Sequence, residues 1–453
     1  MVAKMSDLKF LTKVIFIPTM LILGVSGGQT SDYYNQSVIS TVAFGSCSKN
    51  SLPQTIWQSV IGQKPDLFVW LGDVVYADRR ILPFVWTRNP PEVVEDIYMR
   101  FYNNTAYKFM GILDQILIAN QILLKFRNSG IKIVGVWDDH DYGENGGNKN
   151  SNNKLQTQHV FLNFLDEPSD SKRRQREGIY VSYYFGTGNK TVKLILLDTR
   201  TFFDPINEDI LGNEQWKWLK EQLSEDAALT IIGSSIQVLT DIPFVDRWRF
   251  YKKSFDRFLW LIRSRPRVIL LSGDVHFGEI SCLNESWIGY PIFDITSSGL
   301  THTCETTLVP FSVCSWSLKR YVISKYRVGD IHLNQNFGLI RLKWNEQATE
   351  ISIEIHGLDG LSLQQTVKLS DLDSKSTPAS CPTRVARPTN NMKYAVYAFT
   401  FCALAIPLVL LVLIIRSTNK IFKRMFPPSE PANNCSNPID KAVYHTHNRL
   451  KAE

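Results

Sequence analysis

Four short stretches of this chain place metal-binding side chains directly after apolar, strand-like runs. They are residues 44–47, 71–76, 137–141 and 272–276. Between them they hold carboxylate, imidazole, thiolate and phenolate groups, all of which can bind metal cations. Ligand sites in open α/β sheets gather beyond the carboxyl ends of the strands, so we expect the four stretches to meet at one edge. The pattern predicts a hydrolytic metal centre.

The first two stretches supply an anionic set of candidate ligands. Asp73 follows a glycine at a strand end, Tyr76 lies three residues further on, and Cys47 ends the first stretch. A carboxylate can bridge two cations, and a phenolate with a thiolate carries enough negative charge for Fe³⁺. The structural alternative is that Gly72 and Asp73 turn the chain, Tyr76 packs in the core and Cys47 is a small buried or disulfide-bonded residue.

The third stretch surrounds a histidine with carboxylates. Asp138, Asp139 and Asp141 flank His140 after an apolar run over 134–137. Such carboxylates repel one another unless a cation or extensive hydrogen bonding compensates them. Asp138 and Asp139 are therefore candidate ligands of a second metal, and His140 suits a general acid that protonates a leaving oxygen. The alternative, a solvated surface turn, is disfavoured by the apolar run.

The fourth stretch offers a second ligand pair. Asp274 and His276 follow Gly273, and alternate residues of an extended segment point to the same side. We expect both to bind metal, although such a pair is often a buried histidine with its partner.

Three further polar residues have weaker signals. Arg200 could bind a substrate phosphate or hold Asp198 in a forked ion pair, and we favour the ion pair. His302 and His332 lie in polar surroundings and carry little weight as site residues.

The elements that must position these residues are strands alternating with helices. Trp216, Leu219 and Leu223 recur at helical spacing, with Asn213 as a candidate N-cap. The charged run 169–176 is expected to be a solvated loop. Alternation of this kind predicts a layered α/β domain with helices covering a sheet. We expect strands at 40–45, 67–71, 131–137, 192–197, 229–233 and 268–271, and a terminal antiparallel pair at 337–344 and 350–356.

Composition bounds the class of protein. The chain has 453 residues, of which 44% are hydrophobic and 12% aromatic, so it can bury a large core. The net charge of +7 is concentrated at the two ends: residues 1–27 carry +2 and residues from 416 onward carry +4. The central region is left with about +1, which does not predict a nucleic-acid-binding surface.

The two ends read as targeting segments. An apolar run over 14–25 behind three lysines predicts a cleaved signal peptide at 1–27, with an uncleaved signal anchor as the alternative. Residues 394–415 are uncharged, long enough to span a bilayer as one transmembrane helix, and followed by basic residues that favour a cytosolic tail at 416–453. We therefore expect a single-pass type I membrane protein with an ectodomain at 28–370 and a stalk at 371–393.

Cysteines and sequons fit that topology. The predicted ectodomain and stalk contain Cys47, Cys282, Cys304, Cys314 and Cys381. An odd number leaves one unpaired in an oxidising compartment, so if Cys47 binds metal the other four can form two bridges in three possible ways. The candidate glycosylation sites outside the cytosol are Asn35, Asn103, Asn189 and Asn284.

Taken together, these motifs resemble the PhoD-like alkaline phosphatases, within the calcineurin-like metallophosphoesterase superfamily. The matching pieces occur in family order over about residues 40–300: Phe44-Gly45-Ser46-Cys47-Ser48, Gly72-Asp73-x-x-Tyr76, Trp137-Asp138-Asp139-His140-Asp141, Leu197-Asp198-Thr199-Arg200, Leu211-Gly212-x-Glu214-Gln215-Trp216-x-Trp218-Leu219 and Ser272-Gly273-Asp274-Val275-His276-Phe277-Gly278-Glu279.

The resemblance implies a four-layer α/β/β/α sandwich and a binuclear or larger site with Fe³⁺ and Ca²⁺ or another divalent cation. In that family pattern, Asp73 would bridge the iron to the second metal. The other iron ligands would be Cys47, Tyr76 and His276. The second metal would also be held by Asp139 and Asp274, with the share of Asp138 left open.

The expected reaction is phosphoester hydrolysis, with Asp73 and His140 as catalytic residues. A metal-held hydroxide would attack phosphorus in line, and His140 would protonate the departing alcohol. The patterns do not separate monoesters from diesters. One alternative is a phosphodiesterase of lipid or glycolipid phosphoesters, and another is a non-catalytic receptor. We expect the catalytic domain on the lumenal or extracellular side of the endoplasmic reticulum, Golgi or plasma membrane.

Overall fold

The computed structural model describes residues 31–82, 85–103, 125–243, 245–306, 310–373, 380–383 and 385, together with positions 401, 405, 409, 413, 414, 416 and 417. The chain divides into two compact units, Met1–Arg387 and Pro388–Glu453. Within these described residues, no helix is long and apolar enough to cross a membrane. The predicted signal peptide, and most of the predicted span and cytosolic tail, lie outside the described residues.

Two β-sheets form the body of the first unit. The larger has the order β1 (Tyr33–Asn35), β7 (Val181–Phe185), β8 (Val192–Leu196), β9 (Leu229–Gly233), β10 (Val268–Ser272), β12 (Ile292–Ser297), β11 (Gly278–Leu283) and β13 (Arg327–His332). The smaller has the order β16 (Gly360–Lys368), β15 (Glu350–Gly357), β14 (Phe337–Lys343), β2 (Thr41–Gly45), β3 (Leu67–Leu71) and β6 (Lys132–Val136). A separate hairpin joins β4 (Arg79–Leu82) to β5 (Val85–Thr87).

Parallel strands lie at the centre of both sheets. In the larger sheet β8, β9, β10 and β12 are parallel neighbours, and in the smaller sheet β2, β3 and β6 are. These strands are apolar on both faces because both faces are covered, which is why they read as continuous hydrophobic runs in the sequence. Their carboxyl ends point to one edge of each sheet.

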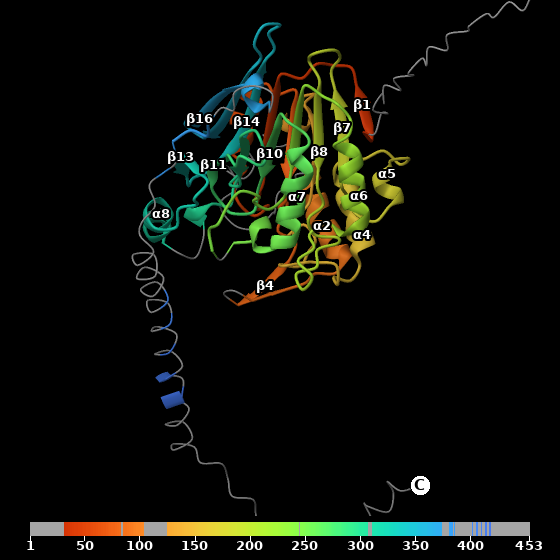
Figure 1. The fold of residues 1–453 in the computed structure, drawn as a ribbon. Helices are drawn as coiled ribbons and strands as arrows, with labels where there is room; N and C mark the ends of the chain where they lie inside the picture. Colours follow the sequence, from red (N-terminus) through yellow and green to blue (C-terminus); the bar gives the residue numbers. More distant parts are fainter. Residues whose placement is uncertain are drawn as a thin grey trace, which may run out of the picture. The chain divides into compact units, whose positions relative to one another are not determined.

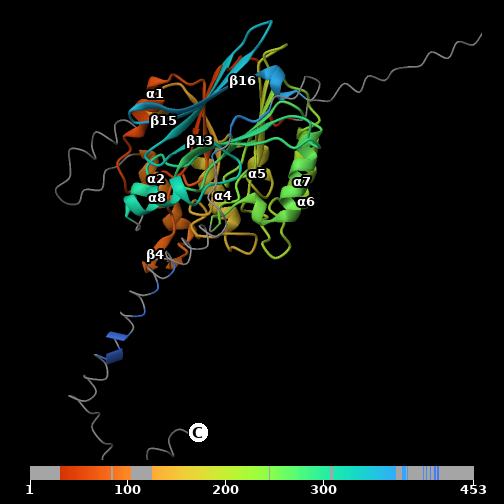
Figure 2. The same cartoon turned by 60° about the vertical axis from the view of Figure 1, so that its left-hand side comes forward.

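Helices cover the outer face of the larger sheet. They are α6 (Gly212–Gln222) and α7 (Lys252–Arg263). Their residues Trp216, Leu219 and Phe258 share a buried cluster with Ile195 and Ile232 of the sheet. Figure 2 shows these two helices on one side of the strands, with α1 and α2 on the other side.

A second helical layer covers the smaller sheet. It contains α1 (Ile56–Gly62), α2 (Pro91–Asn103) and α4 (Lys154–Phe164). The ring of Trp57 lies 5.1 Å from that of Trp70 on β3, whose ring is 6.5 Å from that of Phe101 on α2. The inner faces of the two sheets meet in one buried cluster that includes Val69, Leu71, Ile231 and Leu271. The predicted mixed α/β class is confirmed (Figure 1).

Shorter elements complete the described part of the unit. They are the helices α5 (Lys172–Gln175) and α8 (Phe311–Arg320) and the 3₁₀ turns Trp248–Phe250, Cys304–Thr306 and Leu369–Leu372. The six strands expected between residues 40 and 271 all occur, each within two residues of its expected bounds, and the terminal pair forms as β14 and β15.

Two local expectations were wrong. Asn213 is not the N-cap of α6, because it lies inside the helix, which begins at Gly212. The Asp209 carboxylate accepts hydrogen bonds from the backbone N–H groups of Leu211 and Gly212, at 3.3 and 3.1 Å. The charged run 169–176 is not simply a solvated loop. Its Arg173 is fully buried, where it pairs with Glu167 at 3.0 Å. Arg173 Nη2 also donates to the carbonyl oxygen of Gly135 on β6 at 2.8 Å, a tertiary contact that a local pattern does not record.

Disulfide bonds select one of the three connectivities that the sequence allows. Cys282 pairs with Cys381, Cys304 pairs with Cys314, and Cys47 is free and buried. The asparagines Asn35, Asn189 and Asn284 are exposed, whereas the side chain of Asn103 lies outside the described residues.

We predict that Trp57→Ala lowers the free energy of unfolding by about 3–5 kcal/mol, because it removes a large, fully buried ring and leaves a cavity. The Trp57 ring contacts those of Phe68, Trp70 and Phe126. Denaturant titration of the full-length protein, followed by near-UV circular dichroism, measures the change.

The matched control is Trp260→Ala, on the exposed face of α7, where the side chain is 63% exposed. It should change stability by no more than about 0.5 kcal/mol. Equal losses in the two variants would contradict the packing described for α1.

Candidate metal centre

The carboxyl ends of four parallel strands deliver the candidate ligands to one place. β2 is followed by Cys47, β3 by Asp73, and β10 by Asp274 and His276. After β6 come Asp138, Asp139 and His140. Since β2, β3 and β6 belong to the smaller sheet and β10 to the larger, the two sheets contribute jointly.

Asp73 lies at the centre of this arrangement. Three groups of side chains have ligand atoms within 4.8 Å of one another, and Asp73 belongs to all of them: Cys47 with Asp73 and His276; Asp73 with Asp139 and His140; and Asp73 with Asp138, Asp139 and Asp274. Tyr76 joins the first group, because its hydroxyl lies 3.4 Å from Asp73 Oδ2 and 3.2 Å from His276 Nε2. The structure therefore brings together every residue that the sequence suggested as a ligand.

The backbone is strained where these ligands attach. Cys47, Asp73, Asp274 and His276 have φ values of 60°, 49°, 77° and 64°, in the left-handed region that non-glycine residues seldom occupy. Each such residue costs roughly 1–3 kcal/mol and persists only where the surrounding structure holds it. Clustered strain of this kind is typical of functional sites.

Two glycines let the strand ends approach. A Cβ at Gly72, whose φ is +88°, would lie 2.5 Å from Asp138 Cβ. A Cβ at Gly273 would lie 2.5 Å from Ser46 Oγ and 2.8 Å from the carbonyl oxygens of Leu71 and Ser235. Any larger residue would push the strand ends apart, which explains why a glycine precedes both Asp73 and Asp274.

Burial makes three of the carboxylates difficult to ionise without added positive charge, whereas Arg200 and His140 outweigh burial at Asp139 and lower its pKa. Burial raises the pKa of Asp138 to about 6 despite the opposing effect of Arg200. Burial and neighbouring carboxylates also raise the pKa of Asp73 and of Asp274 well above the usual value. Asp73 Oδ1 and Asp138 Oδ2 are buried and have no hydrogen-bond partner among the described residues. Unpaired buried oxygens within a mixed O, N and S donor set fit a metal cluster.

Arg200 compensates part of this charge. Its guanidinium is buried, forms a close ion pair with Asp138 and lies 3.1 Å from Asp246 Oδ2. The expected side-chain ion pair between Arg200 and Asp198 was wrong. Arg200 contacts that carboxylate through its backbone N–H and not through its guanidinium. Asp198 instead accepts a hydrogen bond from Trp137 Nε1 at 3.0 Å. An arginine engaged in this way favours a structural role over contact with substrate phosphate.

His140 is oriented by a residue that the sequence analysis missed. Its Nδ1 lies 2.9 Å from Asp78 Oδ1, and its ring lies 4.2 Å from that of Tyr76. Burial opposes the charged imidazolium, but Asp139, Asp73 and Asp78 outweigh that effect and raise the pKa of His140 to about 10. With Nδ1 held by Asp78, Nε2 is left for proton transfer. Asp78 follows Tyr76 by only two residues, so proximity to the motif was the available signal.

His302 was also undervalued. Its ring lies 4.1 Å from that of His276 and 5.0 Å from that of Tyr76, at the same site. Burial lowers the pKa of both histidines, to about 4 for His276 and about 2 for His302, so both are neutral at ordinary pH. His302 follows β12, a parallel strand next to β10, and recognising that strand would have indicated it. By contrast, His332 bonds Ser362 and Gln335.

Such an arrangement can support metal-assisted acid–base chemistry. Clustered anionic groups can hold more than one cation, with Asp73 shared between them. His140 is partly accessible, with a side chain 12% exposed, and stands next to the shared carboxylate. A proton donor beside bound cations is a combination that can catalyse hydrolysis of a phosphoester.

Comparison with known proteins identifies the family. No curated protein matches the chain. One solved structure that the comparison matches to this chain is described as "GAP50 the anchor in the inner membrane complex of Plasmodium"; it is 14% identical, with a TM-score of 0.42, and the match covers 73% of this chain and 89% of that one. The family model described as PhoD-like phosphatase matches residues 42–351, which include every residue of the centre. The chain therefore belongs to the PhoD-like phosphatase family.

Proposed function

We propose that this protein hydrolyses phosphoesters at a metal centre built around Asp73, on the lumenal or extracellular side of a secretory-pathway membrane. The observation that carries the proposal is the sharing of Asp73 by three ligand groups beside His140. Membership of a phosphatase family supports a phosphoester as the substrate class.

The donor chemistry supports a mixed pair of metals. Fe³⁺ would be held by Asp73 together with Cys47, Tyr76 and His276. Ca²⁺ or another divalent cation would be held by Asp73, Asp139 and Asp274, and Asp138 would contribute its unpaired Oδ2. When bound, the cations would supply Lewis-acid charge that neutralises the phosphoryl oxygens and activates water.

The chain's own side chains provide the acid–base step and the orientation. His140 donates the proton to the leaving oxygen from Nε2, while Asp78 keeps Nδ1 occupied and fixes the ring. Arg200 holds Asp138 in place through its buried ion pair. The packing that holds the strained backbone at Cys47 and Asp73 also fixes these two side chains before substrate arrives.

The proposed location rests on different residues. Two disulfides are typical of an oxidising compartment, and three of the predicted glycosylation sites are exposed, which supports an ectodomain outside the cytosol. Attachment through one helix over 394–415 rests on the sequence pattern there. A membrane tether would favour the alternative of a phosphodiesterase acting on lipid or glycolipid phosphoesters.

Asp73→Asn should remove nearly all hydrolysis, because it removes the charge that the two metals would share. We expect kcat/KM to fall by about three orders of magnitude, or roughly 4 kcal/mol of barrier. The assay uses full-length protein in detergent with p-nitrophenyl phosphate and bis-p-nitrophenyl phosphate, and the preferred ester divides phosphatase from phosphodiesterase.

The matched control is Asp256→Asn on the exposed surface of α7, which should leave both activities unchanged. Far-UV circular dichroism checks that both variants fold. An active Asp73→Asn protein would exclude the shared-ligand role.

His140→Asn should slow the hydrolysis of some esters more than that of others, depending on the leaving group. Alkyl phosphates need a proton on the departing oxygen, so their hydrolysis should fall by about 10²–10⁴-fold. The p-nitrophenyl ester, whose leaving group is weakly basic, should lose much less. Asp78→Asn should show the same selectivity to a smaller extent, because Asp78 only orients the ring. Equal losses for both kinds of ester would argue against a proton donor.

Metal-free protein should become more stable when Asp138 is neutralised. The pKa of Asp138 is higher in the folded chain than its ordinary 3.8, so the folded state binds this proton more tightly. Stability from this group is present at low pH and is lost as pH rises from about 4 to about 6.

Asp138→Asn removes that loss. Its stability relative to wild type should rise over the same pH range, by roughly 3 kcal/mol at most, and then stay constant. Thermal unfolding of chelator-treated protein from pH 4 to 8 measures it, and added metal should reverse the order. If the stability of the two proteins changed equally with pH, Asp138 would not be the group whose ionisation destabilises the metal-free protein.

A further inference from the structure

The backbone of His302 is tied to that of a candidate metal ligand. The backbone N–H groups of Thr301 and His302 both donate to the carbonyl oxygen of Cys47, at 3.1 and 3.0 Å. Leu300 N–H donates to the carbonyl oxygen of the preceding Ser46 at 3.1 Å. The segment after β12 therefore lies directly against the segment after β2, and His302 cannot shift without disturbing the Cys47 backbone.

The imidazole of His302 lies beside the proposed iron ligands. Its ring is tilted by 30° against the ring of His276 and meets the Tyr76 ring edge-on at 68°. The Tyr76 ring also contacts His140, at 4.2 Å. Three imidazoles thus contact Tyr76: those of His140, His276 and His302. His140 is the proposed proton donor and His276 a proposed iron ligand, whereas His302 has no role in the proposed mechanism.

One ring nitrogen of His302, Nδ1, is buried and has no hydrogen-bond partner among the described residues. Leaving a buried polar atom unpaired is costly, so such an atom calls for an explanation. A substrate oxygen at the metal centre would supply the missing partner.

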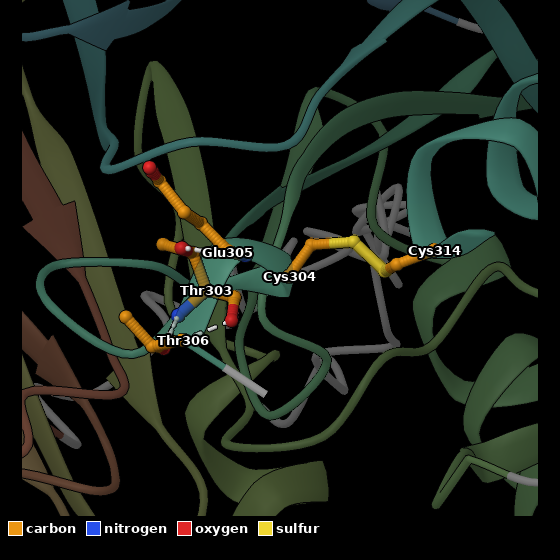
Figure 3. Close-up of a disulfide and its surroundings, with 5 residues drawn as sticks. All are labelled: Thr303, Cys304, Glu305, Thr306 and Cys314. Atoms are coloured by element: carbon orange, nitrogen blue, oxygen red, sulfur yellow. Dashed lines mark hydrogen bonds between the residues drawn. A yellow bond between two sulfur atoms is a disulfide. The ribbon is translucent and has the colours of Figure 1, made fainter. Parts of the chain in front are cut away.

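The loop after His302 holds it in this position. Thr303 N–H donates to Thr306 Oγ1 at 2.8 Å, Thr306 N–H donates back to the Thr303 carbonyl at 2.9 Å, and Cys304 is linked to Cys314 of α8 (Figure 3). A side chain fixed in this way loses little conformational entropy when it binds a ligand.

We propose that His302 contacts the substrate, with its imidazole forming a hydrogen bond to a non-bridging oxygen of the phosphoryl group. This inference rests on the proposed function. The two histidines then have different roles. His140 acts on the leaving oxygen, whereas His302 binds the phosphoryl group and therefore sets KM and the affinity for inorganic phosphate.

Two substitutions separate this role from simple packing. His302→Phe keeps an aromatic ring against His276 and Tyr76 but has no nitrogen. His302→Asn loses the ring but places an amide near the position of Nδ1. We expect His302→Phe to raise KM for p-nitrophenyl phosphate and the dissociation constant of inorganic phosphate by about 10-fold or more, since a hydrogen bond to a charged group is lost. His302→Asn should remain within about threefold of wild type in both constants, because it keeps the hydrogen bond.

The measurements use metal-loaded, full-length protein, with phosphate binding followed by calorimetry so that one readout is independent of turnover. His332→Asn is the matched control and should leave both constants unchanged, because that histidine bonds Ser362 and Gln335 instead. Metal content is measured for every variant.

A wild-type-like His302→Phe beside a defective His302→Asn would overturn the proposal, because the ring would then act by packing. Loss of metal from His302→Phe would overturn it too. If wild type hydrolyses esters and neither variant differs from it, the inference fails and the proposed function stands. If wild type binds phosphate through His302 but does not hydrolyse esters, the inference stands and the proposed function fails. If wild type neither hydrolyses esters nor binds phosphate, both fail.

Discussion

Concentrated negative charge, buried where two sheets meet, is the constraint on which this structure depends. Four carboxylates, those of Asp73, Asp138, Asp139 and Asp274, lie in one group with oxygen atoms within 4.8 Å of one another. Arg200 and His140 offset only part of their charge. Because the interior screens charge poorly, bringing these groups together is unfavourable unless cations neutralise them. Bound cations would account for the clustered ligands, for the strained backbone that holds them and for the acid–base residues beside them.

The fold supplies the rigidity that such a site needs. Parallel strands covered on both faces end at the same edge, and their side chains pack into clusters that leave little freedom. That packing can sustain left-handed backbone at four candidate ligands, each at a cost of roughly 1–3 kcal/mol. Gly72 and Gly273 remove the Cβ atoms that would otherwise separate the strand ends. Core stability and site geometry are therefore linked, since the clusters of the sheets hold the strands that carry the ligands.

Sequence patterns could predict the elements and most of the site, because both are local signals. A buried parallel strand is a run of apolar residues, and the polar residues after it mark its carboxyl end, as at Asp73 and Asp274. Pairings between distant residues leave no such mark. Nothing near Arg200 indicates that it will pair with Asp138, 62 residues away, rather than with Asp198. His302 was undervalued because the strand before it, β12, was not among those expected, and its importance depends on the strand order that places β12 beside β10.

The central claim is that cations hold the carboxylate cluster together, with Asp73 shared between them. Elemental analysis of purified full-length protein tests it most directly, with wild type and Asp73→Asn prepared side by side. We expect more than one metal ion per wild-type chain, with iron among them, and loss of the full set from Asp73→Asn. A folded wild-type protein that carries no metal, or an Asp73→Asn protein that retains its full complement, would contradict the claim.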